Sequence, residues 1–285
     1  MRSALAAAAL SLGFASAATA APHGMYLFPG SPGLAHAVKD PGATMLYYGG
    51  PVLSTVKVVA VIWGKNVNGA VVQGIPGFFT AVTNSTWFDQ MAQYETNRKG
   101  VNGHKGTNQT IGRGTFDKEI TINPHNTNTN LTDRDVQKEI LYQVQHGVLP
   151  KPDANTLYMT YFPPNITITL GGLVSCQSFG AYHEGFKTKA YGGVFYGVEP
   201  DCGFTFDDQT VVSSHELAEA TTDALPTPGN NPAYPQAWNT SDGYEIGDLC
   251  EGYDGQLTAG NTNYYVQQIF RNDINNCSSG NYTSP

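Results

Sequence analysis

One short segment of the chain carries side chains that could bind a metal ion and do chemistry with it. Residues 214–220 read S-H-E-L-A-E-A, which contains an H-E-x-x-E pattern. Residues four apart on an α-helix lie on one face, so His215 and Glu219 could bind the same metal ion. Glu216 lies about 100° further round such a helix and could reach a water molecule on that ion. The pattern predicts a metal site with a general base beside it.

A second segment could complete the site. The expected helix has the geometry of the H-E-x-x-H helix of zinc peptidases, with a carboxylate in place of the second imidazole. A catalytic zinc needs a third protein ligand and an open position for water. Residues 242–250 read D-G-Y-E-I-G-D-L-C. We expect Glu245 to be the third ligand, and Asp248 either to hold His215 or to be the alternative ligand.

These residues predict a hydrolytic reaction. Zinc would lower the pKa of its bound water towards ~7 and polarise a substrate carbonyl, while Glu216 takes the proton and passes it to the leaving group. We expect a zinc-dependent hydrolase, and first of all a peptidase, acting on a peptide or another extracellular polymer. The chain has no G-x-S-x-G, G-x-G-x-x-G or P-loop pattern, which argues against serine hydrolase, dinucleotide and NTP chemistry.

The distribution of charge also indicates a bound cation. The 285 residues include 15 Lys and Arg and 23 Asp and Glu, for a net charge of −8. No Lys or Arg occurs over residues 190–270, where twelve carboxylates fall: Glu199, Asp201, Asp207, Asp208, Glu216, Glu219, Asp223, Asp242, Glu245, Asp248, Glu251 and Asp254. Such a block is costly unless a cation neutralises it. The lack of a basic stripe also argues against nucleic acid as a partner.

Two alternatives to this interpretation stay open at the level of sequence. Calcium could replace zinc, because Asp242, Asp248 and Asp254 offer hard oxygen ligands, although no EF-hand spacing is present. The protein would then be a non-catalytic extracellular protein whose acidic patch binds calcium or cell-wall material. His183 could supply a ligand or an oxyanion donor, but we favour a structural histidine in a loop.

The N-terminal residues predict secretion. Residues 1–20 contain Arg2, then an Ala- and Leu-rich run and the sequence A-T-A, which fits the small-x-small rule for signal peptidase. We expect a signal peptide over residues 1–20, a Pro- and Gly-rich extended leader over 21–44 and one domain over 45–285, in an extracellular or periplasmic protein. No later stretch is apolar for the roughly 20 residues that a membrane span needs.

Four cysteines fit this compartment, and none belongs to a C-x-x-C pair. Three pairings of Cys176, Cys202, Cys250 and Cys277 are possible. Nearest-neighbour pairing would close two loops of similar size, each worth about 3 kcal/mol in the chain-entropy model. A bridge from Cys250 to Cys277 would also fix the segment that carries Glu245.

The elements that must position these residues are helices and strands in mixed order. Residues 56–63 are β-branched and nearly all apolar, which predicts a strand covered on both faces. The clearest helices run over 131–147, capped by Thr132, and from an N-cap at Asp207 or Asp208 to about Thr222. The other expected elements are a helical stretch over 77–94 that breaks near Asn84 and strands over 116–122, 157–162, 166–173 and 193–198. We expect a single α/β (mixed α+β) domain with a central mixed sheet and a zincin-like active-site helix.

Several segments together resemble the EXORDIUM-like, or phosphate-induced, family of secreted proteins. Residues 47–53, Y-Y-G-G-P-V-L, and the strand that ends at Trp63 and Gly64 look like that family's Y-H-G-G-P-x-L segment and the I-W-Y-G strand after it. Similar likenesses follow in the same order at residues 157–160, Cys176 with His183, 196–204, 215–222, 245–250 and Cys277. The resemblance implies an extracellular or cell-wall protein of related fold. The family's plant members, which are associated with growth responses, depart from an intact H-E helix, whereas this chain keeps His215, Glu216 and Glu219.

Overall fold

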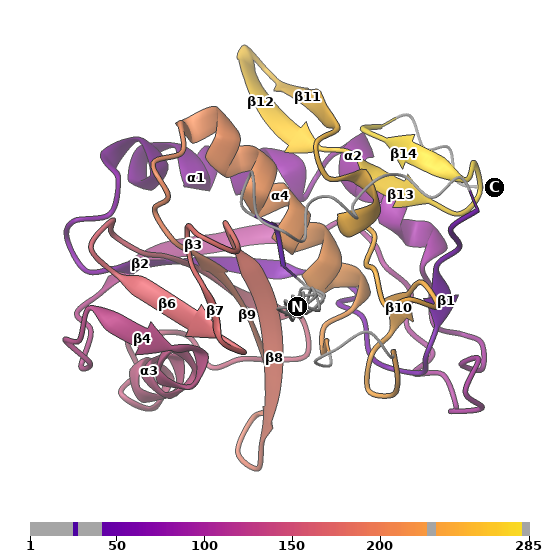
Figure 1. Cartoon of the computed structure of the whole chain (residues 1–285), viewed down its shortest axis with the longest axis horizontal. Coiled ribbons are helices and arrows are strands. Elements are labelled where there is room, and N and C mark those ends of the chain that lie inside the picture. The colour runs from indigo at the N-terminus through magenta and orange to yellow at the C-terminus, as the bar shows by residue number, and fades with distance from the viewer. Residues whose placement is uncertain (1–24, 28–41, 227–231, 281–285) are drawn as a thin grey trace, which may run out of the picture.

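A five-stranded mixed sheet forms the centre of the protein. The computed structural model describes residues 25–27, 42–226 and 232–280 (Figure 1). The strands of the sheet are β2 (Lys57–Trp63), β3 (Thr115–Ile122), β5 (Thr156–Tyr161), β8 (Tyr182–Thr188) and β9 (Gly192–Glu199). Their order is β3-β2-β5-β9-β8, in which the first four strands are parallel and β8 runs antiparallel to β9 along one edge.

Helices cover both faces of this sheet. They are α1 (Gly69–Val82), α2 (Thr86–Asp89), α3 (Asp133–Gln145) and α4 (Phe206–Thr222), with 3-10 turns η2 (Gln90–Gln93) and η3 (Asp248–Cys250). Alternate side chains of β2 enter two cores: Val58 and Ile62 pack with α1 and α4, whereas Val59 and Val61 pack with α3. The strand predicted over residues 56–63 is therefore confirmed as one that is buried on both faces.

The H-E-x-x-E pattern lies on α4, which runs through the protein interior. Thr205 caps the helix: its hydroxyl accepts a hydrogen bond from the Asp208 N–H, and the Asp208 carboxylate accepts one from the Thr205 N–H. The prediction that Asp207 or Asp208 is the N-cap is therefore wrong, because Asp208 is the third residue of a capping box. The predicted end at Thr222 is confirmed, and residues 209–222 are all buried.

The other predicted elements are present with two corrections of extent. The strands expected over 116–122, 157–162 and 193–198 are β3, β5 and β9, and the helix expected over 131–147 is α3. α1 begins at Gly69 and continues through Pro76, because the burial of Ile75, Phe78 and Phe79 outweighs the low helix propensity of its Gly and Pro residues. The break near Asn84 is confirmed.

The strand expected over 166–173 is divided in two. It consists of β6 (Thr167–Leu170) and β7 (Leu173–Val174), separated by Gly171 and Gly172. Both glycines have positive φ angles, of 59° and 90°, which strands do not tolerate and tight turns require. β7 pairs antiparallel with β6, which pairs in parallel with β4 (Asn130–Thr132).

Five short strands lie in the C-terminal part of the described chain. They are β10 (Trp238–Asn239), β11 (Asp254–Ala259), β12 (Thr262–Gln267), β13 (Ile269–Arg271) and β14 (Asn276–Ser278), and β10 pairs with β1 (Leu46–Tyr47). β11 and β12 form a hairpin, and β12 packs along α4 (Figure 1). Sequence patterns predicted none of these strands.

Two disulfides join the chain as nearest neighbours. Cys176 is bonded to Cys202, and Cys250 is bonded to Cys277. The described residues contain no helix that is both long and apolar enough to cross a membrane. The signal peptide expected over residues 1–20 lies outside the described residues, as does most of the expected leader.

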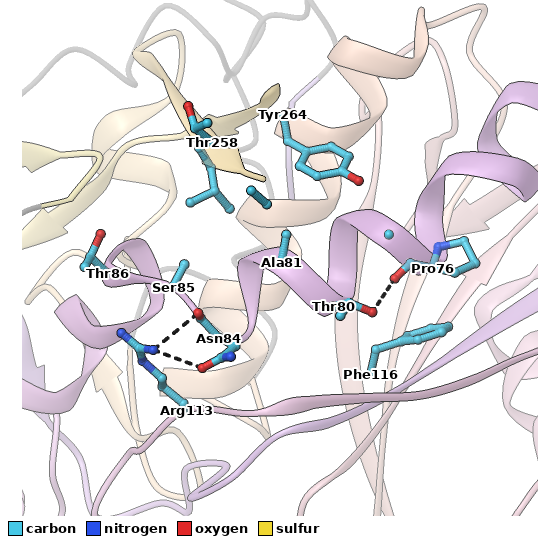
Figure 2. Close-up of a pocket in the computed structure, with 13 residues that line it drawn as sticks. Pro76, Thr80, Ala81, Asn84, Ser85, Thr86, Arg113, Phe116, Thr258 and Tyr264 are labelled. Carbon is cyan, nitrogen blue, oxygen red and sulfur yellow. Dashed lines mark hydrogen bonds between the residues drawn. The ribbon is translucent and has the colours of Figure 1, made fainter. Parts of the chain in front are cut away.

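A cavity of about 810 Å³ lies between α1, β3 and the β11–β12 hairpin (Figure 2). Its lining includes Thr80, Phe116 and Tyr264 and contains neither a carboxylate nor an imidazole. Arg113 at its rim donates to both carboxylate oxygens of Asp89, each at 2.7 Å, and so is already paired. The cavity therefore lacks the residue types that the predicted chemistry needs.

Candidate metal centre

α4 points three side chains of the predicted site into the protein interior. His215, Glu216 and Glu219 are fully buried. The spacing of four residues brings His215 Nε2 to 3.1 Å from Glu219 Oε2. The ligand atoms of all three residues lie within 4.8 Å of one another. That separation allows one metal ion to reach them, since zinc binds nitrogen and oxygen at about 2.0–2.2 Å.

His183 on the neighbouring strand β8 joins this group. Its Nδ1 atom lies 3.4 Å from Glu216 Oε2 and 3.6 Å from Glu219 Oε2, and its side chain is fully buried. The prediction of a loop at His183 is wrong, because the residue lies in the edge strand of the central sheet. Side-chain alternation could have placed it: Tyr182 packs into the core with α3, so its neighbour must point to the opposite face, where α4 lies.

Hydrogen bonds to the far side of each imidazole assign the position of its proton. His183 Nε2 lies 3.1 Å from the Asp223 carbonyl oxygen, which can only accept, so Nε2 carries the proton. His215 Nδ1 lies 3.0 Å from Gln267 Oε1, and the Gln267 amide nitrogen is engaged with the Gly247 carbonyl at 2.8 Å. In their neutral forms, both imidazoles therefore direct a lone pair at the carboxylates. Metal-binding histidines are held in this way by a partner on the other ring nitrogen.

Each glutamate has one oxygen in a hydrogen bond and one without a partner. Glu216 Oε1 accepts from the Tyr26 N–H at 3.1 Å, and Glu219 Oε1 accepts from the Asp248 N–H at 3.0 Å. Glu216 Oε2, Glu219 Oε2, His183 Nδ1 and His215 Nε2 have no hydrogen-bond partner among the described residues. Buried polar atoms without partners are rare in native proteins and cost about 1–3 kcal/mol each. These four atoms contact one another only in ion pairs of 3.1–3.6 Å, and they could serve as ligands for a cation.

The environment separates the pKa values of the two glutamates. Burial raises the pKa of Glu216 well above its usual value, although the charge of His215 opposes the shift. At Glu219 the two imidazoles outweigh burial, and its pKa is lowered. Burial lowers the pKa of His183, whereas at His215 the neighbouring carboxylates outweigh burial and raise the pKa well above its usual value. Glu219 thus stays ionised, as a metal ligand must, while Glu216 is able to take up a proton.

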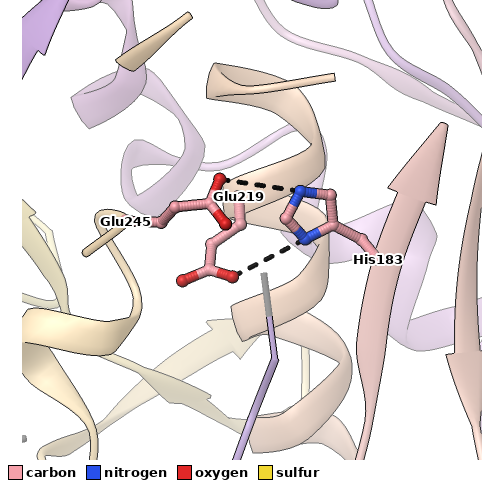
Figure 3. A group of neighbouring side chains, drawn as sticks. All are labelled: His183, Glu219 and Glu245. Carbon is pink, nitrogen blue, oxygen red and sulfur yellow. Dashed lines mark ion pairs between the residues drawn. The ribbon is translucent and has the colours of Figure 1, made fainter. Parts of the chain in front are cut away.

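The two other predicted ligands lie beside His183 and His215. Glu245 Oε1 is 3.6 Å from His183 Nε2, and the ligand atoms of Glu245, His183 and Glu219 form a second group within 4.8 Å (Figure 3). Neither carboxylate oxygen of Glu245 has a hydrogen-bond partner among the described residues. Asp248 Oδ1 is 4.0 Å from His215 Nε2. Glu245 therefore reaches the site beside His183 rather than beside His215, and its binding to a metal stays a prediction.

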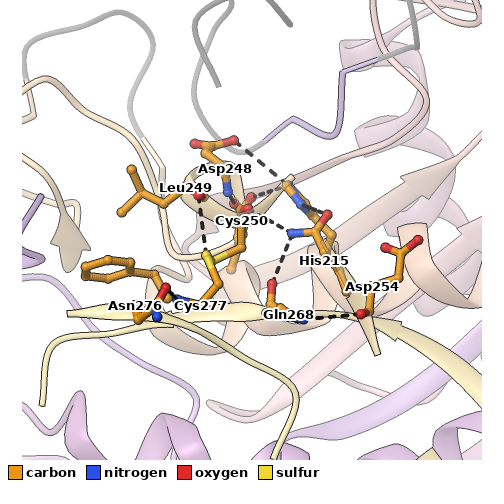
Figure 4. The surroundings of a disulfide bond; sticks show 12 residues. His215, Asp248, Leu249, Cys250, Asp254, Gln268, Asn276 and Cys277 are labelled. Carbon is orange, nitrogen blue, oxygen red and sulfur yellow. Dashed lines mark hydrogen bonds and ion pairs between the residues drawn. A yellow bond between two sulfur atoms is a disulfide. The ribbon is translucent and has the colours of Figure 1, made fainter. Parts of the chain in front are cut away.

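The segment that carries Glu245 and Asp248 packs closely on α4. A Cβ atom at Gly247 would lie 2.7 Å from both Glu219 Oε1 and His215 Nδ1, so only glycine allows this approach. The Cys250–Cys277 disulfide, which follows directly, joins the segment to β14 (Figure 4). The Glu245 N–H donates to Asp248 Oδ2 at 2.8 Å, which closes the turn. The loop is thus built to hold the cluster in place.

No protein-family model, no curated protein and no solved structure matches this chain. The resemblance to the EXORDIUM-like family stays a prediction. The functional argument rests on the side chains of the cluster.

Proposed function

We propose that the protein is a secreted metal-dependent hydrolase, a zinc peptidase in which Glu216 is the general base. One observation carries the proposal: four buried atoms without hydrogen-bond partners, His183 Nδ1, His215 Nε2, Glu216 Oε2 and Glu219 Oε2, meet in the interior in ion pairs of 3.1–3.6 Å. No Lys or Arg occurs in residues 190–270, which supply most of the cluster. A divalent cation would satisfy these atoms and neutralise their charge.

His183, His215 and Glu219 are the ligands that we assign. His183 Nδ1 lies 3.6 Å and His215 Nε2 3.1 Å from Glu219 Oε2, and each ligand is held from behind by a hydrogen bond to Asp223, Gln267 or Asp248. This leaves Glu216 free to act on a substrate. Glu245, which we expected to be the third ligand, lies beside the protonated Nε2 of His183 and is better placed to strengthen that ring's orientation.

The donor set favours zinc over calcium. Two imidazole nitrogens and carboxylate oxygens suit zinc, whereas calcium takes six to eight oxygen ligands. Asp242 and Asp254, which the calcium alternative requires, are exposed, in contrast to the fully buried cluster. The alternative of a non-catalytic protein that binds calcium or wall material therefore has less support at this site.

The chemistry divides between the ion and the chain. Zinc, when bound, supplies a Lewis acid that polarises a carbonyl and lowers the pKa of water. Glu216 Oε2 is the unpaired oxygen that takes a proton and returns it to the leaving group. Glu219 remains ionised and holds its position through the Asp248 N–H. Hydrogen bonds to Asp223 and Gln267 keep the two imidazoles oriented.

Two further features support secretion. Disulfides such as Cys176–Cys202 and Cys250–Cys277 form and persist in oxidising compartments. The described residues contain no helix able to cross a membrane. Together with the signal peptide expected over residues 1–20, they fit an extracellular or periplasmic enzyme.

Metal analysis of the purified protein tests the proposal. We expect about one zinc per chain after dialysis. The variants Glu219→Ala and His183→Ala should lose it, because each removes a ligand. Glu245→Gln should retain it, whereas loss of zinc in this variant would return Glu245 to the ligand set. Calcium in place of zinc, or no metal at all, would overturn the proposal.

A further inference from the structure

Three residues from the N-terminal part of the chain lie across the candidate metal centre. Met25 and Leu27 are 1% and 8% exposed. The ring of Tyr26 stands edge-on to the imidazole of His215, with 5.3 Å between ring centroids. This segment belongs to the leader for which the sequence predicted little structure, yet it contacts the cluster that we assign to catalysis.

The segment is held mainly through its backbone. The Tyr26 N–H donates to Glu216 Oε1 at 3.1 Å, and the Leu27 N–H donates to Glu251 Oε1 at 2.8 Å. In addition, the Tyr26 carbonyl accepts from the Gly180 N–H at 2.8 Å, and Leu27 forms an antiparallel bridge with Phe179. An extended peptide that adds to an exposed backbone edge makes contacts of this kind, which do not depend on its side chains.

The edge that receives the segment is fixed in the fold. Phe179 and Gly180 lie one residue before β8, which begins at Tyr182 and carries His183. The Cys176 N–H donates to the Phe179 carbonyl at 2.8 Å, and Cys176 is bonded to Cys202. One rigid element therefore presents both a metal ligand and a backbone edge along which a peptide can lie.

We propose that this edge and the carboxylates of Glu216 and Glu251 form a binding site for an extended polypeptide, and that Met25–Leu27 is its built-in occupant, which blocks the centre until it is displaced. The inference rests on the proposed function, because it takes Glu216 to be the base. While the Tyr26 N–H engages Glu216 Oε1, a substrate peptide cannot lie along the same edge. The site thus selects main chain in an extended form, and the protein is held in a latent state.

Full-length variants that release the segment test this. Tyr26→Pro with Leu27→Pro removes both donating N–H groups, whereas the matched control Tyr26→Phe keeps the backbone and the ring. The probe is a fluorescent synthetic peptide with the sequence of residues 22–30, P-H-G-M-Y-L-F-P-G. The double variant should bind it at least about tenfold more tightly than wild type does, because a site blocked in nine of ten molecules weakens apparent affinity by about that factor. Tyr26→Phe should bind as wild type does.

A second variant guards against misfolding of the first. Met25 is 1% exposed, so Met25→Asp would bring a charge into its buried position, should release the segment while leaving the edge itself unchanged, and should increase peptide binding in the same direction. Unchanged peptide affinity in variants whose circular dichroism and Tm match wild type would overturn the inference. Binding is measured with and without chelator. Peptide binding to a released variant that holds no zinc and hydrolyses nothing would support the inference while the proposed function fails.

Discussion

Buried glutamates occur in both helical layers of the protein, and they differ in whether their oxygens are used. In the α3 layer Glu139 is 2% exposed. Its Oε1 accepts from the His125 N–H at 2.9 Å and from Gln143 Nε2 at 2.6 Å, and its Oε2 accepts from the Asn126 N–H at 3.0 Å. In the α4 layer Glu216 and Glu219 each leave one buried oxygen without a hydrogen bond.

This difference in hydrogen bonding distinguishes a structural carboxylate, Glu139, from carboxylates that could bind a metal or act on a substrate. Glu139 connects α3 to the loop after β3, because both of its carboxylate oxygens accept hydrogen bonds from neutral donors of that loop and that helix. Burial alone therefore does not mark a functional site in this chain. What marks one is burial together with unpaired atoms that face one another, as His183 Nδ1 and Glu216 Oε2 do at 3.4 Å.

The largest effect is expected at Glu216, and Glu139 provides the comparison. Glu216→Gln should lower turnover of a peptide substrate by about 10² to 10⁴-fold, because the amide cannot take a proton, and should leave zinc bound. Steady-state kinetics with metal analysis of the same samples measures both. Equal turnover in wild type and Glu216→Gln would remove Glu216 from the mechanism.

Glu139→Gln is the control from the other layer. It replaces an oxygen that accepts backbone N–H groups with an NH₂ group, so it should lower the free energy of unfolding by about 1–3 kcal/mol. Zinc content and turnover should match wild type. A Glu139→Gln variant that loses zinc would break the comparison between the layers.

Zinc removal should affect stability in a pH-dependent way. Burial raises the pKa of Asp223 to about 7 and that of Glu251 to about 7. Between about pH 4 and pH 7 the folded apoprotein therefore keeps protons that the unfolded chain has lost, so its stability falls as the pH rises. Zinc at 1,000 times its Kd should add about 4 kcal/mol to the holoprotein.

The stability that zinc adds to the folded protein should also increase with pH, since protons compete with the metal for its ligands. Thermal melts in EDTA and in excess zinc, from pH 5 to pH 8, measure both trends. The Tm difference between the two series should widen towards pH 8. Parallel series would show that the α4 layer does not bind the added metal.

A smaller effect is expected at Gln267, which holds His215 from behind. Gln267→Ala removes the acceptor for the Nδ1 proton of His215, and such partners are worth about 10 to 100-fold in metal affinity. Gln143→Ala is the matched change in the α3 layer, where the amide donates to Glu139. Zinc titration should show weaker binding in the first variant only. Equal affinity in both would mean that His215 needs no support from Gln267.

Local patterns were sufficient to predict much of this architecture. The β-branched run of β2, the capped helix α3 and the end of α4 each depend on residues that are close in sequence, so a short stretch of sequence is enough to predict them. The same holds for the H-E-x-x-E spacing, which α4 converts directly into the contact between His215 and Glu219.

Contacts between segments that are far apart in the sequence could not be predicted from such short stretches. β8 does not alternate polar and apolar residues, since His183 and Glu184 are adjacent, and its place at the sheet edge depends on pairing with β9, so His183 was expected in a loop. Met25–Leu27 has no strand pattern of its own. It is positioned by carboxylates far away in the sequence, Glu216 and Glu251, together with the edge at Gly180.

The smallest expected effect compares the caps of the two helices. The N–H groups of Thr132 and Thr205 donate to Asp135 and Asp208 at 3.0 and 3.1 Å, so α3 and α4 begin with the same capping box. Thr132→Ala and Thr205→Ala should each lower the free energy of unfolding by about 1 kcal/mol. Neither should change zinc affinity, because His215 lies further along α4 in the part that is buried throughout. Weaker zinc binding in Thr205→Ala would show instead that the ligand geometry depends on the whole helix, and that packing around residues 209–222 is not enough to maintain it.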